Sequence, residues 1–214
     1  LADWFIRMNE ILPAEEIDLD PVFLAPALGE EGVACIRSWY ASQQVGGYVG
    51  RRLAVLEGSA EAVLRPHGLK GSAALRYEEI IGGLCDIGRY GLAFDWSEKA
   101  VNECAVEETR NIASGWAVLA KEHFPEHSER VARRVFDRYP ELSSAQQLYA
   151  AGTDKAKSAT HIQATLAVKP WDLAMFQHLC LEDPALAWNT VVQAGMEQSM
   201  AQRFLEDLPE QALP

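Results

Sequence analysis

The sequence predicts an all-α protein: a single compact multi-helix domain of antiparallel helical hairpins, with about nine to eleven helices. Apolar residues recur at helical spacing along most of the 214-residue chain. The segments between them carry the proline, glycine and capping residues that begin and end helices. In addition, no stretch alternates polar and apolar residues between turn signals, as a half-buried strand would.

The N-terminal third of the chain predicts a series of short and medium helices. Asp3 begins a first helix, and Asp20 with Pro21 restarts the chain as an N-cap and first helical residue. Further helices are predicted over 30–44 and 49–63. The second of these has a regular apolar stripe, formed by Val49, Leu53, Leu56, Ala60 and Val63.

A helical hairpin is predicted in the middle of the chain. Ser72 caps a helix over 73–90, and a long helix of about seven turns covers 96–124. Asp95 and Glu98 form a capping box at the start of the long helix. Glycines inside the first helix predict that another segment approaches it closely; they are Gly82, Gly83 and Gly88.

Further helices are predicted after Pro125, each bounded by proline, glycine or a capping aspartate. They cover 126–139, 143–151, 154–168, 171–181 and 184–208. We expect one domain over 1–214, with an N-terminal subregion over 1–70 packed on a helical core over 71–214.

The composition indicates a folded cytoplasmic protein. Hydrophobic residues make up 49% and charged residues 23% of the chain, as in ordinary globular proteins. Without a run of 18 apolar residues, we expect no membrane span, and the acidic, amphipathic N-terminus is unlike a signal peptide. The widely spaced cysteines predict reduced thiols: Cys35, Cys85, Cys104 and Cys180.

The net charge of −12 is unevenly distributed. Residues 1–31 hold eight acids and one base, whereas residues 37–76 hold six bases and two acids. Because phosphate contacts need positive surface, we do not expect nucleic-acid binding. We predict instead a protein partner with a basic surface, and Trp171, just after a helix-breaking proline, fits a partly exposed interface anchor. The predicted partner-binding residues are Glu15, Glu16, Asp18, Asp20 and Trp171.

Glu108 lies in the middle of the apolar face of the helix predicted over 96–124. A buried carboxylate costs several kcal/mol unless it is paired or protonated. Three interpretations are open: a structural ion pair, exposure beside a narrower apolar face, or a polar group at the floor of a pocket, with His161 or His178 as a companion.

The sequence contains no motif that we can assign to a reaction. His123 and His127 have metal-ligand spacing, but Pro125 separates them, and no HExxH occurs. Cys180 and His178 are two residues apart, which points them in different directions on a helix. We therefore expect no metal and no cofactor.

Three classes of function remain. We favour a non-catalytic protein-binding module with an acidic surface, such as an inhibitor or immunity-type protein that neutralises a basic partner. The first alternative is a small helical-bundle enzyme or ligand-binding protein with an inter-helix pocket around Glu108. The second is a structural subunit of a larger assembly, and the sequence leaves open whether the chain forms a homo-oligomer.

Overall fold

The computed structural model describes residues 1–11, 20–43, 48–65 and 72–195, and these residues are all-α. They form twelve α-helices, one more than the upper end of the predicted number, in sequential antiparallel contact. The predicted fold class is therefore confirmed. The chain groups into two units, Leu1–Ile112 and Ala113–Pro214. The single domain over 1–214 and its subregion over 1–70 stay predictions.

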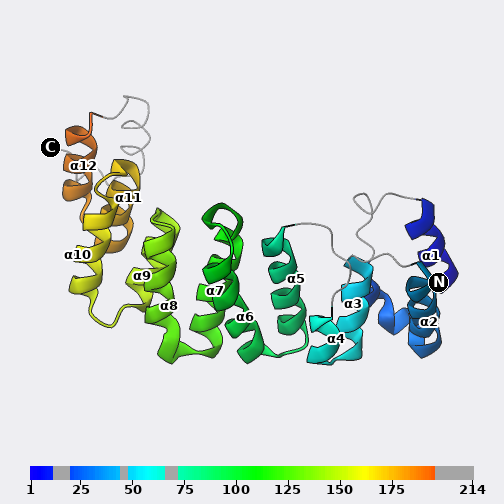
Figure 1. Ribbon diagram of the computed structural model, residues 1–214. Helices are drawn as coiled ribbons and strands as arrows, with labels where there is room; N and C mark the ends of the chain where they lie inside the picture. Colours follow the sequence, from blue (N-terminus) through cyan, green and yellow to red (C-terminus); the bar gives the residue numbers. More distant parts are fainter. Residues whose placement is uncertain (12–19, 44–47, 66–71, 196–214) are drawn as a thin grey trace. The chain divides into compact units, whose positions relative to one another are not determined.

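The first unit holds the helices from α1 to α6 (Figure 1). They are α1 (Ala2–Ile11), α2 (Pro21–Gln43), α3 (Tyr48–Glu57), α4 (Ala60–Leu64), α5 (Ala73–Asp86) and α6 (Tyr90–Glu103), followed by the 3-10 helix η1 (Val106–Glu108). Phe5, Ile36 and Leu53 are buried in one apolar cluster that joins α1, α2 and α3. Helices α5 and α6 form an antiparallel hairpin, and α5 also contacts α3 and α4.

Charged side chains join three segments of this unit. The guanidinium of Arg52 on α3 contacts Asp20 through Nε, at 2.9 and 3.0 Å from the two carboxylate oxygens, and also pairs with Asp86 at the end of α5. Asp20 additionally accepts the backbone N–H of Val22 at 2.8 Å, which confirms its predicted role as the N-cap of α2. The network fixes the start of α2 against α3 and α5.

Glycines in the left-handed backbone region interrupt the helices of this unit. Gly29, Gly58 and Gly88 have φ of 64°, 67° and 70°. A left-handed residue cannot continue an α-helix. Gly29 therefore kinks α2, and Gly58 divides the single helix predicted over 49–63 into α3 and α4. That prediction of one helix was wrong, because its apolar stripe continues across the turn.

The central helix predicted over 96–124 is also wrong. Helix α6 begins earlier, at Tyr90, so that Asp95 is inside it, and it ends at Glu103 because Cys104 is extended (φ −97°, ψ 163°). After η1, the hydroxyl of Thr109 donates to the carbonyl of Ala105 at 3.0 Å, and α7 starts at the next residue. Thr109 is fully buried, so this turn is anchored in the core.

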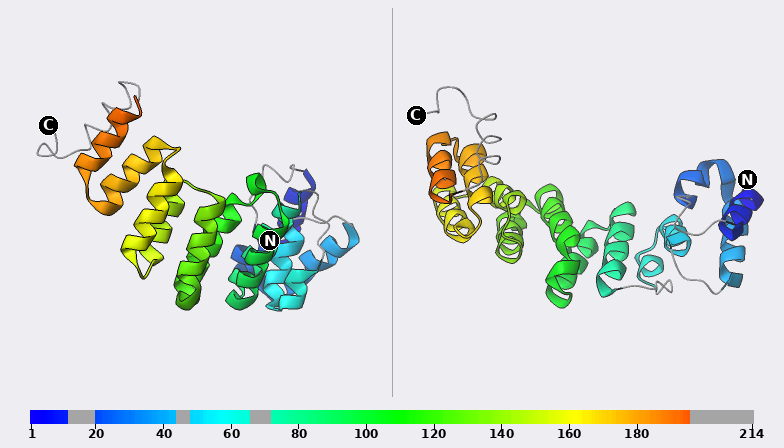
Figure 2. Two further views of the ribbon diagram at one scale, coloured as in Figure 1. Left: turned by 60° about the vertical axis from the view of Figure 1, so that its left-hand side comes forward. Right: turned by 90° about the horizontal axis from the view of Figure 1, so that it is seen from above.

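The second unit continues with α7 (Arg110–His123), which crosses the boundary between the units, and the helices after it (Figure 2). They are α8 (Pro125–Arg138), α9 (Leu142–Ala151), α10 (Lys155–Leu166), α11 (Pro170–Leu181) and α12 (Pro184–Gln193). Phe136, Leu148, Ile162 and Phe176 bring α8 to α11 together in one fully buried cluster. A smaller cluster packs α12 on α11.

Helix boundaries in this unit follow the sequence closely. The prolines at the start of α8, α11 and α12 occupy the first turn, and Asp154 and Asp183 accept backbone N–H groups as N-caps of α10 and α12. The last helix was predicted over 184–208, but α12 ends at Gln193 and the chain turns at Gly195, which has φ of 61°, so that prediction was wrong. Residues 196–208 lie outside the described residues. Within the described ranges, none of the helices has the length and apolarity needed to cross a membrane.

Candidate functional site

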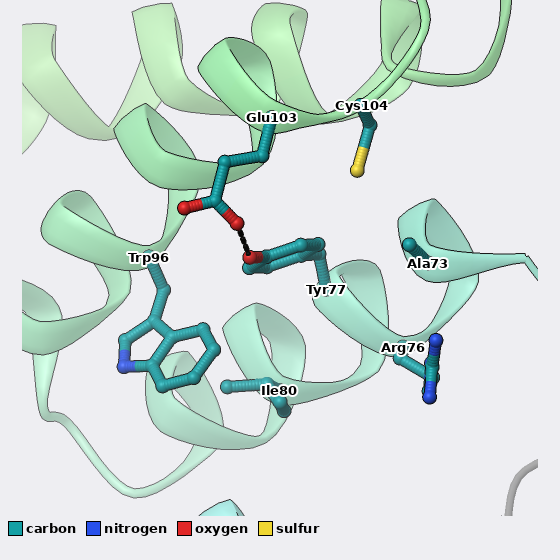
Figure 3. Close-up of a pocket in the computed structure, with 7 residues that line it drawn as sticks. All are labelled: Ala73, Arg76, Tyr77, Ile80, Trp96, Glu103 and Cys104. Atoms are coloured by element: carbon teal, nitrogen blue, oxygen red, sulfur yellow. Dashed lines mark hydrogen bonds between the residues drawn. The ribbon is translucent and has the colours of Figure 1, made fainter.

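A pocket of about 320 Å³ opens between α5 and α6 in the first unit (Figure 3). Its side chains combine two aromatic rings, a carboxylate, a guanidinium and a thiol. The lining residues are Ala73, Arg76, Tyr77 and Ile80 from α5, Trp96 and Glu103 from α6, and Cys104 just after α6.

Helix geometry explains why these residues share a pocket. The four α5 residues stand at i, i+3, i+4 and i+7, which is the spacing of one helix face. Trp96 and Glu103 are roughly two turns apart on α6 and also share a face. Because α5 and α6 pack as an antiparallel hairpin, the two faces meet, and Tyr77 lies across from both Trp96 and Glu103.

The carboxylate of Glu103 is held in place by Tyr77. The Tyr77 hydroxyl donates to Oε2 of Glu103 at 2.5 Å. Burial, and then this hydrogen bond, raise the pKa of Tyr77 to about 12, so the phenol remains a donor at neutral pH. The other oxygen of Glu103 has no partner among the described residues and points away from Tyr77, on the side of Trp96 (Figure 3).

The aromatic rings complete an environment for a cation. The ring centroids of Tyr77 and Trp96 are 5.6 Å apart with planes inclined by 51°. Lys99 already places its ammonium 4.9 Å from the centroid of the Trp96 ring, and Arg76 points away from Glu103 (Figure 3). A carboxylate with a free oxygen beside aromatic rings is a suitable contact for an ammonium or guanidinium group.

The charge around the pocket also favours a cationic ligand. Residues 73–109 hold eight acidic and three basic side chains, a net charge of −5. Two of the acids are neutralised by α3, because Glu79 pairs with Arg51 and Asp86 pairs with Arg52. The remaining carboxylates still exceed the bases of this segment, so the local potential attracts cations.

The structure describes two of the five predicted partner-binding residues. Glu15, Glu16 and Asp18 lie outside the described residues. Asp20 is only 6% exposed and bonds to Arg52, so its role is structural and we remove it from the partner-binding set. Trp171 is partly buried against the cluster that joins α11 and α12.

Glu108 is exposed, so the prediction of its burial was wrong. Its place in the apolar stripe assumed one continuous helix, and the chain instead turns through η1 at that point. Of the three interpretations, exposure is correct, although the reason is the break in the helix and not a narrower apolar face. A pocket with Glu108 at its floor does not form.

The other groups considered from the sequence lie apart. His123 ends α7 and His127 belongs to α8, so the two are on different helices. Within the described ranges, no group of three or more metal-binding side chains is suited to hold a metal ion. None of the four cysteines forms a disulfide in the structure, and burial raises the pKa of Cys85 and Cys180.

Sequence reasoning missed the pocket although it identified its parts. Tyr77, Trp96 and Glu103 lie in the helices predicted over 73–90 and 96–124, but none of them was predicted as a site residue. The predicted hairpin was a usable signal, because it places Tyr77 and Trp96 on adjacent helices. What the sequence did not provide is the register between those helices.

Comparison of the chain with protein-family models, curated proteins and solved structures gave no match. Function is therefore inferred from the pocket and its charges alone.

Proposed function

We propose that the protein is a non-catalytic helical module that binds a basic protein partner, with the pocket between α5 and α6 receiving a lysine or arginine side chain. The observation that carries this proposal is the free carboxylate oxygen of Glu103 beside the rings of Tyr77 and Trp96. In this complex the partner cation pairs with Glu103 and packs on the aromatic rings.

Charge supports the proposal at longer range. The net charges of −12 for the chain and −5 for residues 73–109 steer a cationic partner toward this face and raise its association rate. An inhibitor that neutralises a basic protein is one form that such a module takes. The ligand-binding alternative around Glu108 loses its support, because Glu108 is exposed.

A pair of labelled peptides tests the pocket. We expect a dodecapeptide of alternating lysine and glycine to bind at 50 mM salt, and its glutamate counterpart not to bind. Glu103→Gln should weaken binding by about fivefold, as for loss of one partly exposed ion pair. Fluorescence anisotropy measures both, and binding should fall steeply as salt rises.

Asp95→Asn provides the matched control. Asp95 is exposed on the same helix and does not line the pocket, so the substitution removes the same charge outside the pocket. It should change the affinity by less than twofold. Equal losses for Asp95→Asn and Glu103→Gln would show that only overall charge matters, and absence of lysine-peptide binding would remove the proposal.

The acidic N-terminal segment is tested separately. Glu15, Glu16 and Asp18 remain predicted partner contacts, and their joint reversal to lysine should slow association while leaving the melting temperature unchanged. Asp20 is left intact because its loss would break the network with Arg52. An unchanged association rate removes this segment from the binding surface.

A further inference from the structure

The pocket between α5 and α6 lies beside a cation that belongs to the chain itself. Lys99 on α6 places its ammonium 4.9 Å from the centroid of the Trp96 ring, which lines that pocket. Because Lys99 is three residues after Trp96 and four before Glu103, the three side chains share one face of α6. The ammonium is therefore within reach of both groups that the proposed partner cation contacts.

The Trp96 ring is the only group that holds Lys99 in this position within the described ranges. The Lys99 side chain is exposed, and among those residues it makes no hydrogen bond and no ion pair. It does not pair with the free oxygen of Glu103, and a lysine four residues before a glutamate is the weaker order of such a helical pair. Since a cation–π contact at an exposed position is weak, a partner cation that also pairs with Glu103 can replace Lys99.

Lys155 in the second unit shows what a structural contact of the same kind looks like. Its ammonium lies 5.0 Å from the centroid of the Tyr149 ring, but it also donates to the backbone carbonyls of Tyr149 and Ala150, the second at 3.0 Å. These carbonyls are in the last turn of α9, where they lack intrahelical partners. Lys155 thus satisfies a helix end, whereas Lys99 contacts no acceptor of this kind.

From this comparison we infer that Lys99 is a built-in competitor, which occupies the Trp96 ring until a lysine or arginine of the partner displaces it. The inference rests on the proposed function and adds a regulation of the same site. A cation that contacts only the ring exchanges one such contact for another, so pairing with Glu103 decides which cations bind. Loss of the Lys99 ammonium leaves the ring free and strengthens binding of the partner.

Affinities of the full chain for the dodecapeptide of alternating lysine and glycine test the competition. Lys99→Met should bind the peptide about two- to fivefold more tightly than the wild type, which is the factor of an exposed cation–π contact. Lys99→Arg keeps a cation beside the ring and should not strengthen binding. A gain of the same size in Lys99→Arg would overturn the inference.

A charge-restoring variant separates competition from net charge. Asn102 is exposed on α6, outside the pocket lining, and points about 120° away from Trp96 around the helix. Lys99→Met combined with Asn102→Lys has the net charge of the wild type but no ammonium on the ring. This double variant should keep the tighter binding of Lys99→Met. A return to the wild-type affinity would show that only charge matters and would overturn the inference.

Carbon–proton NMR spectra of the lysine side chains measure the displacement itself. The Trp96 ring should shift the Lys99 methylene signals upfield, and their absence from Lys99→Arg identifies them. A saturating amount of the peptide should remove this shift, whereas the signals of Lys155 beside Tyr149 should not move.

The inference and the proposed function fail in different ways. If Glu103→Gln weakens peptide binding but the Lys99 signals do not move and Lys99→Met binds no more tightly, the competitor is ruled out and the proposed function stands. If the peptide binds neither the wild type nor Lys99→Met, the pocket takes no cation, and both proposals fail.

Discussion

Residues 1–112 and residues 113–214 differ in the residue type that most often separates their helices, although α2 also begins at Pro21 and Gly195 also has positive φ. In the first unit the chain turns at Gly29, Gly58 and Gly88, all with positive φ. In the second unit α8, α11 and α12 each begin with proline in the first turn. Glycine provides a left-handed conformation that other residues rarely adopt, whereas proline at a helix start fixes φ and gives up an N–H that has no intrahelical partner.

The two units also differ in charge. Residues 1–112 hold 18 acidic and 10 basic residues, a net charge of −8, whereas residues 113–214 hold 13 acidic and nine basic residues, a net charge of −4. The ion pairs of Arg51 and Arg52 join separate elements of the first unit. In the second unit, Arg133 pairs within α8. The second unit also has a contact between helices, since His161 on α10 lies 2.8 Å from Asp137 on α8.

The largest expected difference in stability is between substitutions of two arginines, one in each unit. Arg52→Met leaves the carboxylate of Asp20, which is only 6% exposed, without its cation, and should lower the free energy of unfolding by about 3 kcal/mol. Arg133→Met removes a half-exposed pair within one helix and should cost less than about 1 kcal/mol. Urea unfolding of both variants measures the difference. Equal losses of unfolding free energy would show that these ion pairs contribute equally to the stability of the two units.

Substitution of glycine by alanine tests how closely helices pack inside each unit. A Cβ at Gly83 would lie 2.8 Å from Cγ1 of Val63, so Gly83→Ala should cost about 1–3 kcal/mol. Its neighbour Gly82 is exposed with open space around it, and Gly82→Ala should stabilise α5 by up to about 1 kcal/mol. Thermal unfolding should therefore shift in opposite directions for adjacent residues of one helix.

The same contrast is expected in the second unit. A Cβ at Gly152 would collide with the Ser158 hydroxyl, which is buried, so Gly152→Ala should be destabilising. Gly115→Ala, in open space on α7, should stabilise the helix. If Gly82→Ala and Gly115→Ala both destabilise, the spacing of helices around these positions is different from that described.

The smallest expected effects are in the pH dependence of folding stability. Backbone and hydroxyl donation from Thr153 lowers the pKa of Glu129 in the second unit, so its stabilisation is present above the ordinary glutamate pKa and is lost as pH falls below it. Tyr77 in the first unit has a raised pKa of about 12, so its contribution is present below pH 10 and is lost as pH rises toward 12.

Two substitutions measure these opposite pH dependences. Glu129→Gln should reduce stability at neutral pH but not at strongly acidic pH, as followed by urea midpoints. Glu103→Gln should lower the pKa of Tyr77 without bringing it to its ordinary value, because burial is the larger cause. Ultraviolet titration of the phenol, with Tyr77→Phe to identify its signal, checks the second result. A Tyr77 pKa that does not change would show that the contact with Glu103 is absent.

Proline and capping residues made most helix boundaries predictable. Pro125, Asp154 and Asp183 each mark a helix start in the sequence and in the structure. The break after Glu103 was missed because apolar spacing continues across it without glycine or proline. Thr109, preceded by two glutamates, was the available signal, since a hydroxyl and negative charge commonly precede a helix start.

The candidate sites were less predictable than the helices. Tyr77, Trp96 and Glu103 come together only in the register of the α5–α6 hairpin, which depends on packing along its whole length. A pocket between α7, α8 and α9 is lined mainly by alanine, serine and glutamine. These residue types are common on any helix, so no local pattern distinguishes them.

The turn between α6 and α7 has a consequence for how this chain can change in evolution. Residues 105–108 are exposed, and α6 ends before them at Cys104. The buried Thr109, just before α7, bonds back to Ala105 and Val106. Residues added there would leave the cores on either side intact if Thr109 still bonds back to the turn, because insertions are tolerated where backbone is exposed. We expect relatives of this protein to vary in length at this turn, and to conserve length across the short proline-bounded joins.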